Sequence, residues 1–468
     1  MIIMKKFSAK EKAAYGIGAV GKDMVYALSS SYVMYYYQDI LGLSATFVGM
    51  ILMIARIFDA FNDPFMGILV AKTNTKYGKF RPWIISGSVL NAFVLYALFS
   101  APSISSTGLM VYFAVIYILW GVTYTMMDIP FWSMIPAVTE KPSDREQLSV
   151  IGRTCAGVGS ALIQVGTVMC VAWLGGNSEA IGFKWFSLIV SIIFVVTESI
   201  LFFTIKEKKS DKQMETTTVK EMFQALFHND QAMVTVITII LINSALYITS
   251  NLILYFFKYD LGGEAWKTQY TLFTTVGGAG QIFGMMLIYP LLRKKLSNVT
   301  IFKTSLVMAI VGYICLLLSC LTNLAHAMVL LCAIGLLVFV ANGMLSVLTT
   351  VFLSNSVDYG ELKTGRREES VIFSMQTFVV KAASGFAVFL SGIGLDLIGL
   401  NGNSADGIPV AQSASTITGL RLLMTILPCI TLLVALVLFK KKFILTDDKA
   451  NEIAQALSEK KHEMESTN

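Results

Sequence analysis

The sequence predicts an all-α polytopic membrane protein with twelve transmembrane helices in two six-helix bundles. Of its 468 residues, 55% are hydrophobic and only 14% are charged. The mean hydropathy of +0.68 is too high for a soluble protein that hides its apolar residues in a core. Apolar segments of spanning length recur from end to end, and basic residues gather in alternate links between them.

The apolar segments number twelve. They cover residues 13–38, 45–71, 83–101, 108–136, 149–174, 183–205, 231–258, 268–291, 300–321, 327–353, 370–399 and 414–439. Each is long enough to supply the roughly 20 residues that a helix needs to cross a bilayer. We therefore expect each segment to form one spanning helix.

Charge in the links predicts the orientation and the domain boundaries. Basic residues fill the N-terminus and every second link, whereas links such as 101–107, 322–325 and 401–404 are nearly uncharged, which predicts cytoplasmic termini. The net charge of +6 is therefore an orientation signal and not a sign of nucleic-acid binding. No cleavage site for a removable signal peptide is expected. The predicted parts are an N-terminal bundle (1–205), a central cytoplasmic loop (206–230), a C-terminal bundle (231–439) and a cytoplasmic tail (440–468).

Motifs for enzymes and pumps are missing from the sequence. Its six cysteines lie in apolar segments without metal-type spacing, and its three histidines lie in or near links. There is no Gly-x-Ser-x-Gly elbow and no Gly-Lys-Ser/Thr phosphate loop. We expect a secondary transporter that works as a monomer without a cofactor other than a coupling cation. An ion channel is the alternative, but two unlike halves suit alternating access better.

Two acids lie in the middle of the second segment. Asp59 and Asp63 are four residues apart, so a helix places both on one face, with Asn62 beside them. A carboxylate at mid-membrane costs about 2.5–3.5 kcal/mol, so such a pair indicates an ion path, a cavity or a buried counter-charge. Pro64 lacks a backbone N–H and can end or kink a helix, so the alternative is a loop or helix end in which both acids are solvent-exposed.

Tyr124, Asp128 and Trp132 form a stripe at spacings of four in the fourth segment, with Thr125 at its edge. A carboxylate accepts hydrogen bonds from neighbouring hydroxyls, and an indole packs on the apolar face of a pyranose, so the stripe fits a carbohydrate. Taken alone, Trp132 also fits an anchor at the membrane interface.

Further charged and polar residues fall inside predicted spans. Two alternatives are open for Lys22 and Asp23: they neutralise each other near a helix end, or they belong to a site. The second is favoured by Gly16, Gly18 and Gly21, which permit close helix contact or access. Arg153 is a candidate counter-charge for Asp23 or Asp128, or a cytoplasmic positive charge. Segment 370–399 offers the polar residues Gln376, Thr377 and Lys381. Lys381 is a candidate for binding substrate, for neutralising the acid pair when the cation leaves, or for pairing with a carboxylate for structure. Glu198 is expected to extend from its helix toward the cytoplasm.

A cation site made of Asp59, Asn62, Asp63 and the Thr125 hydroxyl would supply only hard oxygen ligands. Such ligands suit Na⁺ or Li⁺, whereas a carboxylate with a raised proton affinity would take H⁺ instead. Neutralising two close carboxylates orders their surroundings for the solute, and linkage makes the effect reciprocal. The residues by themselves therefore indicate a cation-coupled transporter of a neutral polar solute.

Seven motifs together resemble the glycoside-pentoside-hexuronide cation symporters of the major facilitator superfamily, over essentially the full length. Beside the Asp59/Asp63 stretch they are Tyr15-Gly-Ile-Gly-Ala-Val-Gly-Lys-Asp23, Met34-Tyr-Tyr-Tyr37, Gly78-Lys-Phe-Arg-Pro-Trp83, Tyr117-Ile-Leu-Trp-Gly-Val-Thr-Tyr-Thr125, Asp128-Ile-Pro-Phe-Trp132 and Val357-Asp-Tyr-Gly360. Asp128 and Gln376 resemble the branch of bacterial melibiose carriers in particular.

The resemblance implies a major facilitator fold in the bacterial cytoplasmic membrane and uptake of galactosides such as melibiose with Na⁺, Li⁺ or H⁺. The residues that resemble the cation site of that branch are Asp59, Asn62, Asp63 and Thr125. Of these, Asp59 and Asp63 are the implied Na⁺ ligands. The residues that resemble its sugar site are Asp23, Asp128, Trp132 and Arg153, surrounded by Lys22, Tyr124, Gln376, Thr377 and Lys381.

Two positions depart from the melibiose branch. Ser346 stands where a tryptophan is expected and Asn355 where an acid is expected, which puts in doubt the fit of a second sugar unit and a cytoplasmic gate. The alternative substrate is that of another member of the family, such as a β-glucuronide or a xyloside. A transporter of a solute other than sugar, or a channel, is a more distant alternative.

Overall fold

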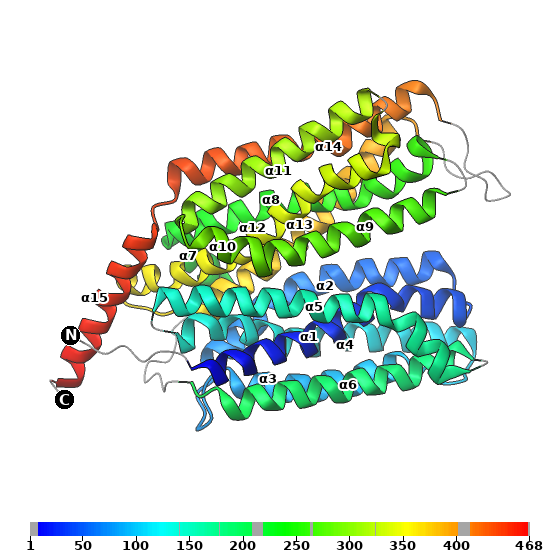
Figure 1. Cartoon of the computed structure of the whole chain (residues 1–468). Coiled ribbons are helices and arrows are strands. Elements are labelled where there is room, and N and C mark those ends of the chain that lie inside the picture. Colours follow the sequence, from blue (N-terminus) through cyan, green and yellow to red (C-terminus); the bar gives the residue numbers. More distant parts are fainter. Residues whose placement is uncertain are drawn as a thin grey trace. The chain divides into compact units, whose positions relative to one another are not determined.

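The structure is a computed structural model that describes residues 8–139, 141–176, 178–207, 219–262, 265–322, 324–400 and 412–466. These residues form helices joined by short links and contain no β-strand (Figure 1). The all-α prediction is therefore confirmed. Residues 208–218 of the predicted central loop and the outer link at 401–404 lie outside the described residues.

The first six predicted spans are all helical. The helices are α1 (Ala9–Tyr35) with the π-helical turn η1 (Tyr36–Ile40), α2 (Ala45–Lys72), α3 (Arg81–Leu98), α4 (Ser106–Val138), α5 (Pro142–Gly175) and α6 (Glu179–Thr204). Local chemistry sets several starts: Ser8 and Glu11 form a capping box at α1, and the side chain of Ser105 caps α4.

The last six predicted spans are helical too. They correspond to α8 (Asp230–Tyr255) with η2 (Phe256–Leu261), α9 (Trp266–Phe283) with η3 (Gly284–Ile288) and α10 (Tyr289–Arg293), α11 (Asn298–Leu321), α12 (Met328–Thr364), α13 (Glu369–Leu397) and α14 (Ala414–Lys442). Shorter or more polar helices are α7 (Val219–His228), η4 (Leu324–His326) and α15 (Asp447–Ser466).

Helices α5, α7 and α12 differ from the sequence prediction: α5 begins at Pro142 instead of 149. Helix α12 continues to Thr364 although the apolar segment was expected to end at 353, because a helix can extend beyond the apolar part of a span. Helix α7 lies inside the predicted central loop. Hydropathy identifies the membrane-crossing part of a helix but does not detect polar turns that continue the helix beyond it.

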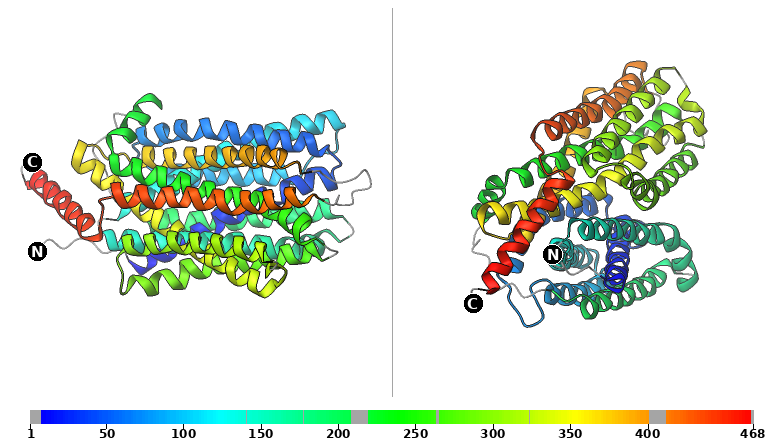
Figure 2. Two further views of the ribbon diagram at one scale, coloured as in Figure 1. Left: turned by 90° about the horizontal axis from the view of Figure 1, so that it is seen from above. Right: turned by 60° about the vertical axis from the view of Figure 1, so that its left-hand side comes forward.

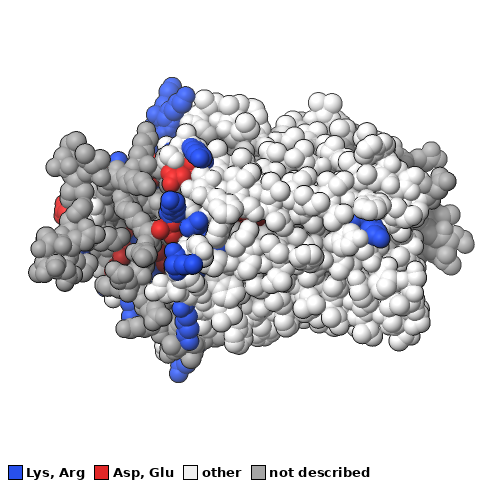
Figure 3. Space-filling view, turned by 90° about the horizontal axis from the view of Figure 1, so that it is seen from below, with Lys and Arg blue, Asp and Glu red and all other residues white. Residues whose placement is uncertain are grey.

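Eight helices in the described part of the chain are long and apolar enough to cross a membrane by length and composition. They are α4, α5, α6, α8 with η2, α9 with η3 and α10, α11, α12 and α14. The four other predicted spans are α1, α2, α3 and α13, and charges such as Lys22, Asp59 and Lys381 lie in three of them. Figure 3 shows one face on which charged side chains gather toward one end beside a broad uncharged area.

The helices belong to two compact units. The first takes in Met1–Ala232, Leu353–Phe378 and Asp448–Asn468, and the second takes in Met233–Phe352 and Val379–Asp447. In the first unit α1 packs against α5 and α6, α3 packs against α4 and α6, and α2 packs against α4 (Figures 1 and 2). The predicted boundaries at 205, 230 and 439 stay a prediction.

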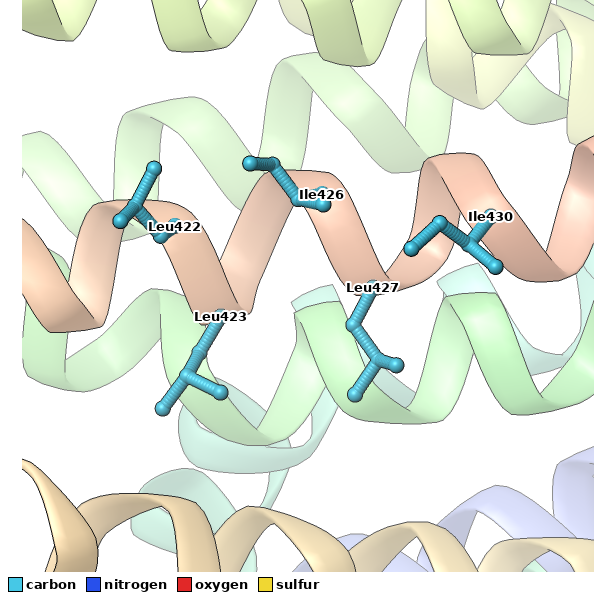
Figure 4. A pocket seen from close by; sticks show the side chains of 5 residues that line it. All are labelled: Leu422, Leu423, Ile426, Leu427 and Ile430. Atoms are coloured by element: carbon cyan, nitrogen blue, oxygen red, sulfur yellow. The ribbon is translucent and has the colours of Figure 1, made fainter.

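The second unit has an aromatic and aliphatic core. Its buried residues include Leu252, Phe256, Phe257, Leu316, Leu420 and Met424. Arg421 of α14 donates two hydrogen bonds of 2.7 Å to the two carboxylate oxygens of Asp260 in η2. A hollow beside α14 is lined by five aliphatic side chains, Leu422, Leu423, Ile426, Leu427 and Ile430 (Figure 4). Their side chains offer no hydrogen bond to a polar solute, so the hollow is not a candidate sugar site.

Glycines let α1 lie very close to its neighbours. A Cβ atom on Gly21 would lie 2.0 Å from Oγ1 of Thr197 in α6, and one on Gly159 of α5 would lie 2.3 Å from the carbonyl oxygen of Val20. Both distances are far below van der Waals contact. The expectation that the glycines of α1 permit close helix contact is therefore correct.

We predict that Gly21→Leu lowers the thermal unfolding midpoint of the purified protein, followed by tryptophan fluorescence in detergent. The added side chain needs the space that Thr197 fills, and overpacking of this kind costs about 1–3 kcal/mol. Gly166→Leu in α5 is the matched control, because nothing lies within 4 Å of a Cβ there. Equal midpoints for the two variants would contradict the close packing of α1 on α6.

Candidate functional site

The two acids of α2 lie inside one continuous helix. Helix α2 runs unbroken through Pro64, Asp63 is fully buried, and Asp59 is only 9% exposed. The alternative of a wet loop or helix end is therefore wrong. Neighbouring helices compensate for the hydrogen bond that a proline removes, and α2 packs along α4 here.

Both acids face α4. The hydroxyl of Thr125 donates a hydrogen bond of 3.1 Å to Oδ1 of Asp63. One turn earlier on both helices, a Cβ on Gly121 would lie 2.5 Å from Oδ1 of Asp59, so only glycine lets that carboxylate approach. Asn62 is half-buried beside them, and its amide nitrogen has no hydrogen-bond partner. The structure thus brings Asp59, Asp63 and Thr125 together.

The oxygens of this group suit a hard, singly charged cation. Two carboxylates, one hydroxyl and one amide oxygen are the available donors, and oxygen ligands favour hard ions over transition metals. Among the described residues, no group of three or more His, Cys, Asp or Glu side chains is placed to hold a metal ion. The group therefore lacks the ligands of a structural zinc site.

A second group is built around Lys22 of α1. Its ammonium nitrogen lies 2.7 Å from Oδ1 of Asp128 in α4 and 3.1 Å from Oδ2 of Asp23. It also donates a hydrogen bond of 3.1 Å to the Tyr124 hydroxyl. Lys22 is only 3% exposed. Neutralisation of Asp23 by Lys22, one of the two alternatives, is therefore observed, but the same ammonium group also reaches across to α4.

Trp132 and Arg153 complete this group. The indole nitrogen of Trp132 donates a hydrogen bond of 3.1 Å to Oδ1 of Asp128, and the ring is buried. The guanidinium carbon of Arg153 in α5 lies 4.0 Å from the centre of the Trp132 ring. These contacts tie Trp132 to the acid, so the alternative of an interfacial anchor is wrong. A cation over the indole face also holds the ring in one orientation.

Stacked aromatic rings extend from this group along α4. The rings of Tyr117 and Trp120 are 5.7 Å apart, and those of Trp120 and Tyr124 are 5.4 Å apart. Asn91 of α3 donates a hydrogen bond of 3.0 Å to the Trp120 carbonyl. Trp120 was not among the predicted site residues, although its spacing of three and four from Tyr117 and Tyr124 marks one helix face.

The three candidates in α13 are placed differently. Thr377 donates its hydroxyl to the Phe373 carbonyl at 2.8 Å, and Gln376 is half-buried. Both belong to the first compact unit, whereas Lys381 belongs to the second. Their assignment to the sugar site stays a prediction.

Comparison with known proteins identifies the family. A family model described as MFS/sugar transport protein matches residues 14–444. The chain belongs to this family. Membership places it among multi-pass membrane transporters, not among enzymes, and agrees with the resemblance to glycoside and cation symporters.

Relatives match the transporter over nearly its whole length. It is 28% identical to the inner membrane symporter YicJ of Escherichia coli over 97% of this chain and 96% of the relative. It is 28% identical to a lactose permease of Lactobacillus delbrueckii (95% of this chain, 72% of the relative). It is 27% identical to a raffinose carrier protein of Pediococcus pentosaceus (95% and 70%).

Solved structures support the fold of the transporter. The proton:xylose symporter XylE superposes with a TM-score of 0.64 at 14% identity, over 96% of this chain and 98% of that one. At this identity the likeness shows the fold alone. The predicted major facilitator fold is therefore confirmed.

Glu198 of the transporter is buried in α6. Its side chain is fully buried, and neither carboxyl oxygen has a hydrogen-bond partner. The expectation that Glu198 extends toward the cytoplasm is wrong. A Cβ on Gly18 would lie 3.4 Å from Oε2 of Glu198, so the carboxyl group points at α1. Close packing of α1 on α6 directs the side chain inward, which the sequence of α6 alone does not reveal.

An ion-pair network at the end of α12 was missed by the sequence interpretation. Asp358 forms an ion pair with Arg145 of α5 and lies 2.8 Å from Arg367. The Arg367 guanidinium also donates a hydrogen bond to the Pro136 carbonyl at the end of α4. Glu369 accepts from Arg367 and lies 3.7 Å from Lys79. Arg367 is in the link before α13, where these acids raise its pKa against the effect of burial.

The neighbouring Asn355 is buried. It stands where an acid was expected, and Asp358 supplies an acid one helical turn later. The doubt about a cytoplasmic gate on this helix therefore applies to Asn355 itself and not to the whole segment. The signal for the network was present in Val357-Asp-Tyr-Gly360 and the basic residues of the links.

We predict that Lys22→Met destabilises the transporter, because it leaves Asp23 and Asp128 without their shared counter-charge. Breaking a buried ion pair from one side costs about 3–5 kcal/mol. The thermal unfolding midpoint in detergent measures the loss, with Lys441→Met at the exposed end of α14 as control. Adding Asp128→Asn to Lys22→Met should recover part of the loss. An unchanged midpoint in the single variant would contradict the shared ion pair.

Proposed function

We propose that the transporter is a secondary symporter that takes up a galactoside such as melibiose together with Na⁺, Li⁺ or H⁺ by alternating access. One observation carries the proposal: α4 contacts both polar groups. Thr125 binds the acid pair of α2, and Asp128, three residues later, binds Lys22 and Trp132. Residues three apart lie on neighbouring faces of a helix, so a cation that neutralises the acids at Thr125 influences the sugar ligands around Asp128.

Chemistry supports a neutral sugar. The hydrogen-bonding groups at Asp128 include one carboxylate, an ammonium, an indole N–H and a phenol, which match sugar hydroxyls, while the Trp132 ring offers an apolar face. The relatives named for lactose and raffinose support a galactoside, because both sugars contain a galactosyl unit. A uronide would bring a third carboxylate beside Asp23 and Asp128, which share Lys22 and have Arg153 as the neighbouring cation.

The proposed setting is the cytoplasmic membrane of a bacterium, with both termini in the cytoplasm and a monomer as the working unit. The basic links support this orientation. In the proposed cycle the cation binds first at Asp59, Asp63, Asn62 and Thr125 and relieves the repulsion of the acids. The sugar then binds better, and by linkage it tightens cation binding by the same factor.

Uptake of labelled melibiose into membrane vesicles with imposed Na⁺, Li⁺ or H⁺ gradients tests the proposal directly. We expect accumulation that needs both gradient and sugar, and inhibition by galactosides in preference to β-glucuronides and xylosides. Preferential inhibition by a glucuronide or a xyloside would identify that glycoside, and not a galactoside, as the substrate. Cation flux that proceeds without sugar would favour a channel.

We predict that Asp59→Cys abolishes cation-driven accumulation of melibiose while leaving melibiose binding measurable. The change removes the Asp59 carboxylate, which lies against Gly121, and leaves the contact between Lys22 and Asp128 in place. Vesicle uptake and equilibrium binding are compared with Asp448→Cys, a control at an exposed acid of α15. Na⁺-stimulated accumulation at the level of the unmodified protein would refute the cation assignment.

We predict that Asp128→Ala weakens melibiose binding at least about tenfold, since hydrogen bonds to a charged group contribute about 1.5–3 kcal/mol. Equilibrium binding to the purified protein at saturating Na⁺ measures it, with Asp448→Ala as the control. Unchanged affinity in Asp128→Ala would move the sugar site away from α4.

A further inference from the structure

Glu198 is a carboxyl group that the proposed transport cycle leaves unused. It is the single ionisable side chain between Trp185 and Thr204 in the sequence, it is fully buried, and both of its oxygens lack a hydrogen-bond partner. An ionised carboxylate in such surroundings has lost its hydration without gaining compensating hydrogen bonds. The protonated form carries no net charge and is the stable one there.

The position of Glu198 next to α1 is built by small residues. Gly18 lies against its Oε2 atom, and a Cβ on Gly18 would also lie 2.8 Å from Leu201, so no larger residue fits without displacement. Lys22 is one helical turn after Gly18 on the same face of α1. Phe131 of α4 closes the same contact, 3.4 Å from that Cβ. The carboxyl group therefore adjoins the group of Lys22 and Asp128.

The helices around α6 bring specific charges near Glu198. Lys22 and Asp23 of α1 and Asp128 of α4 interact with it electrostatically, as does the Tyr15 phenol. Helix α3 meets α6 through the Ser191 hydroxyl, which donates to the Ala92 carbonyl at 3.0 Å. Helix α5 contacts α6 where the Val171 carbonyl of α5 packs on Gly182 of α6. The turn η1 contacts α6 where the Tyr36 ring packs on Phe183 of α6.

We propose that Glu198 is a proton-binding site, separate from the acid pair of α2, and that its protonation is coupled through Lys22 to the sugar site. This inference rests on the proposed function for the coupling, though not for the proton itself. A neutral Glu198 leaves the Lys22 ammonium to Asp23 and Asp128. Loss of the proton to bulk water creates a third carboxylate near one ammonium and draws Lys22 toward α6.

The sign of the coupling follows from this competition. Protonated Glu198 favours the arrangement in which Lys22 lies 2.7 Å from Asp128, which is the arrangement that presents Asp128 and Trp132 to a sugar. Sugar affinity should therefore be highest at low pH and fall as Glu198 loses its proton. By linkage, sugar binding should promote proton uptake by the same factor. The effect should persist when Na⁺ saturates the α2 site.

The first experiment needs no substrate. Infrared spectra of the purified full-length protein are recorded across a pH series for the unmodified chain, Glu198→Gln and Glu179→Gln. Glu179 is the matched control because it lies on the same helix at its exposed end, where it accepts a hydrogen bond from Tyr35. We expect a protonated-carboxyl C=O band in the unmodified protein that bleaches at alkaline pH, is absent in Glu198→Gln and is unchanged in Glu179→Gln.

The second experiment measures melibiose binding by calorimetry between about pH 6 and pH 9 at saturating Na⁺, where full coupling to one proton changes affinity up to about tenfold per pH unit. We expect affinity to fall with pH in the unmodified protein and in Glu179→Gln. In Glu198→Gln, whose amide mimics the protonated acid, affinity should stay at the low-pH value.

The outcomes separate the two proposals. A band of unchanged intensity in Glu198→Gln, no such band in the unmodified protein, or the same pH dependence of binding in all three proteins would overturn the Glu198 inference. Absence of melibiose binding in the unmodified protein at every pH would overturn the proposed function, and the infrared comparison would still decide whether Glu198 carries a proton. If Glu198→Gln does not fold, absence of the band from the unmodified protein across the pH series still overturns the inference.

Discussion

The ammonium group of Lys22 is held between Asp23 and Asp128 inside the first compact unit, and the candidate site is built on that contact. Charges at this depth are tolerated only when they neutralise one another and are hydrogen-bonded. Tyr124 and Trp132 supply hydrogen bonds to this group. The close approach of α1 to α5 and α6, which its glycines permit, positions Lys22 at α4.

Helix α4 gives the transporter a physical connection between its two polar groups. Gly121 and Thr125 receive the acids of α2, and Tyr124, Asp128 and Trp132 receive Lys22 and Arg153. A helix is stiff over so few residues, so a small shift that improves one contact changes the other. Packing of Asn91 against Trp120 ties the same segment to α3. Coupling between ion and solute then needs no distant relay.

Much of the site followed from the sequence because spacing on a helix is fixed. Asp59 with Asp63, and Tyr124 with Asp128 and Trp132, lie on common faces for any regular helix, and the structure places them so. The partners across helices did not follow. Spacing did not show that Lys22 bridges two acids, that Arg153 lies over Trp132, or that Arg367 joins Asp358 to the end of α4.

The sequence by itself determined the class of the protein, the positions of its spanning helices and the faces on which its acids lie, because hydrophobicity and helical period act locally along the chain. Tertiary structure alone decided that Glu198 is buried against Gly18 and that Asp59 fits against Gly121. These are contacts between helices far apart in sequence. Their geometry depends on which small residues face each other, and no pattern within one helix contains that information.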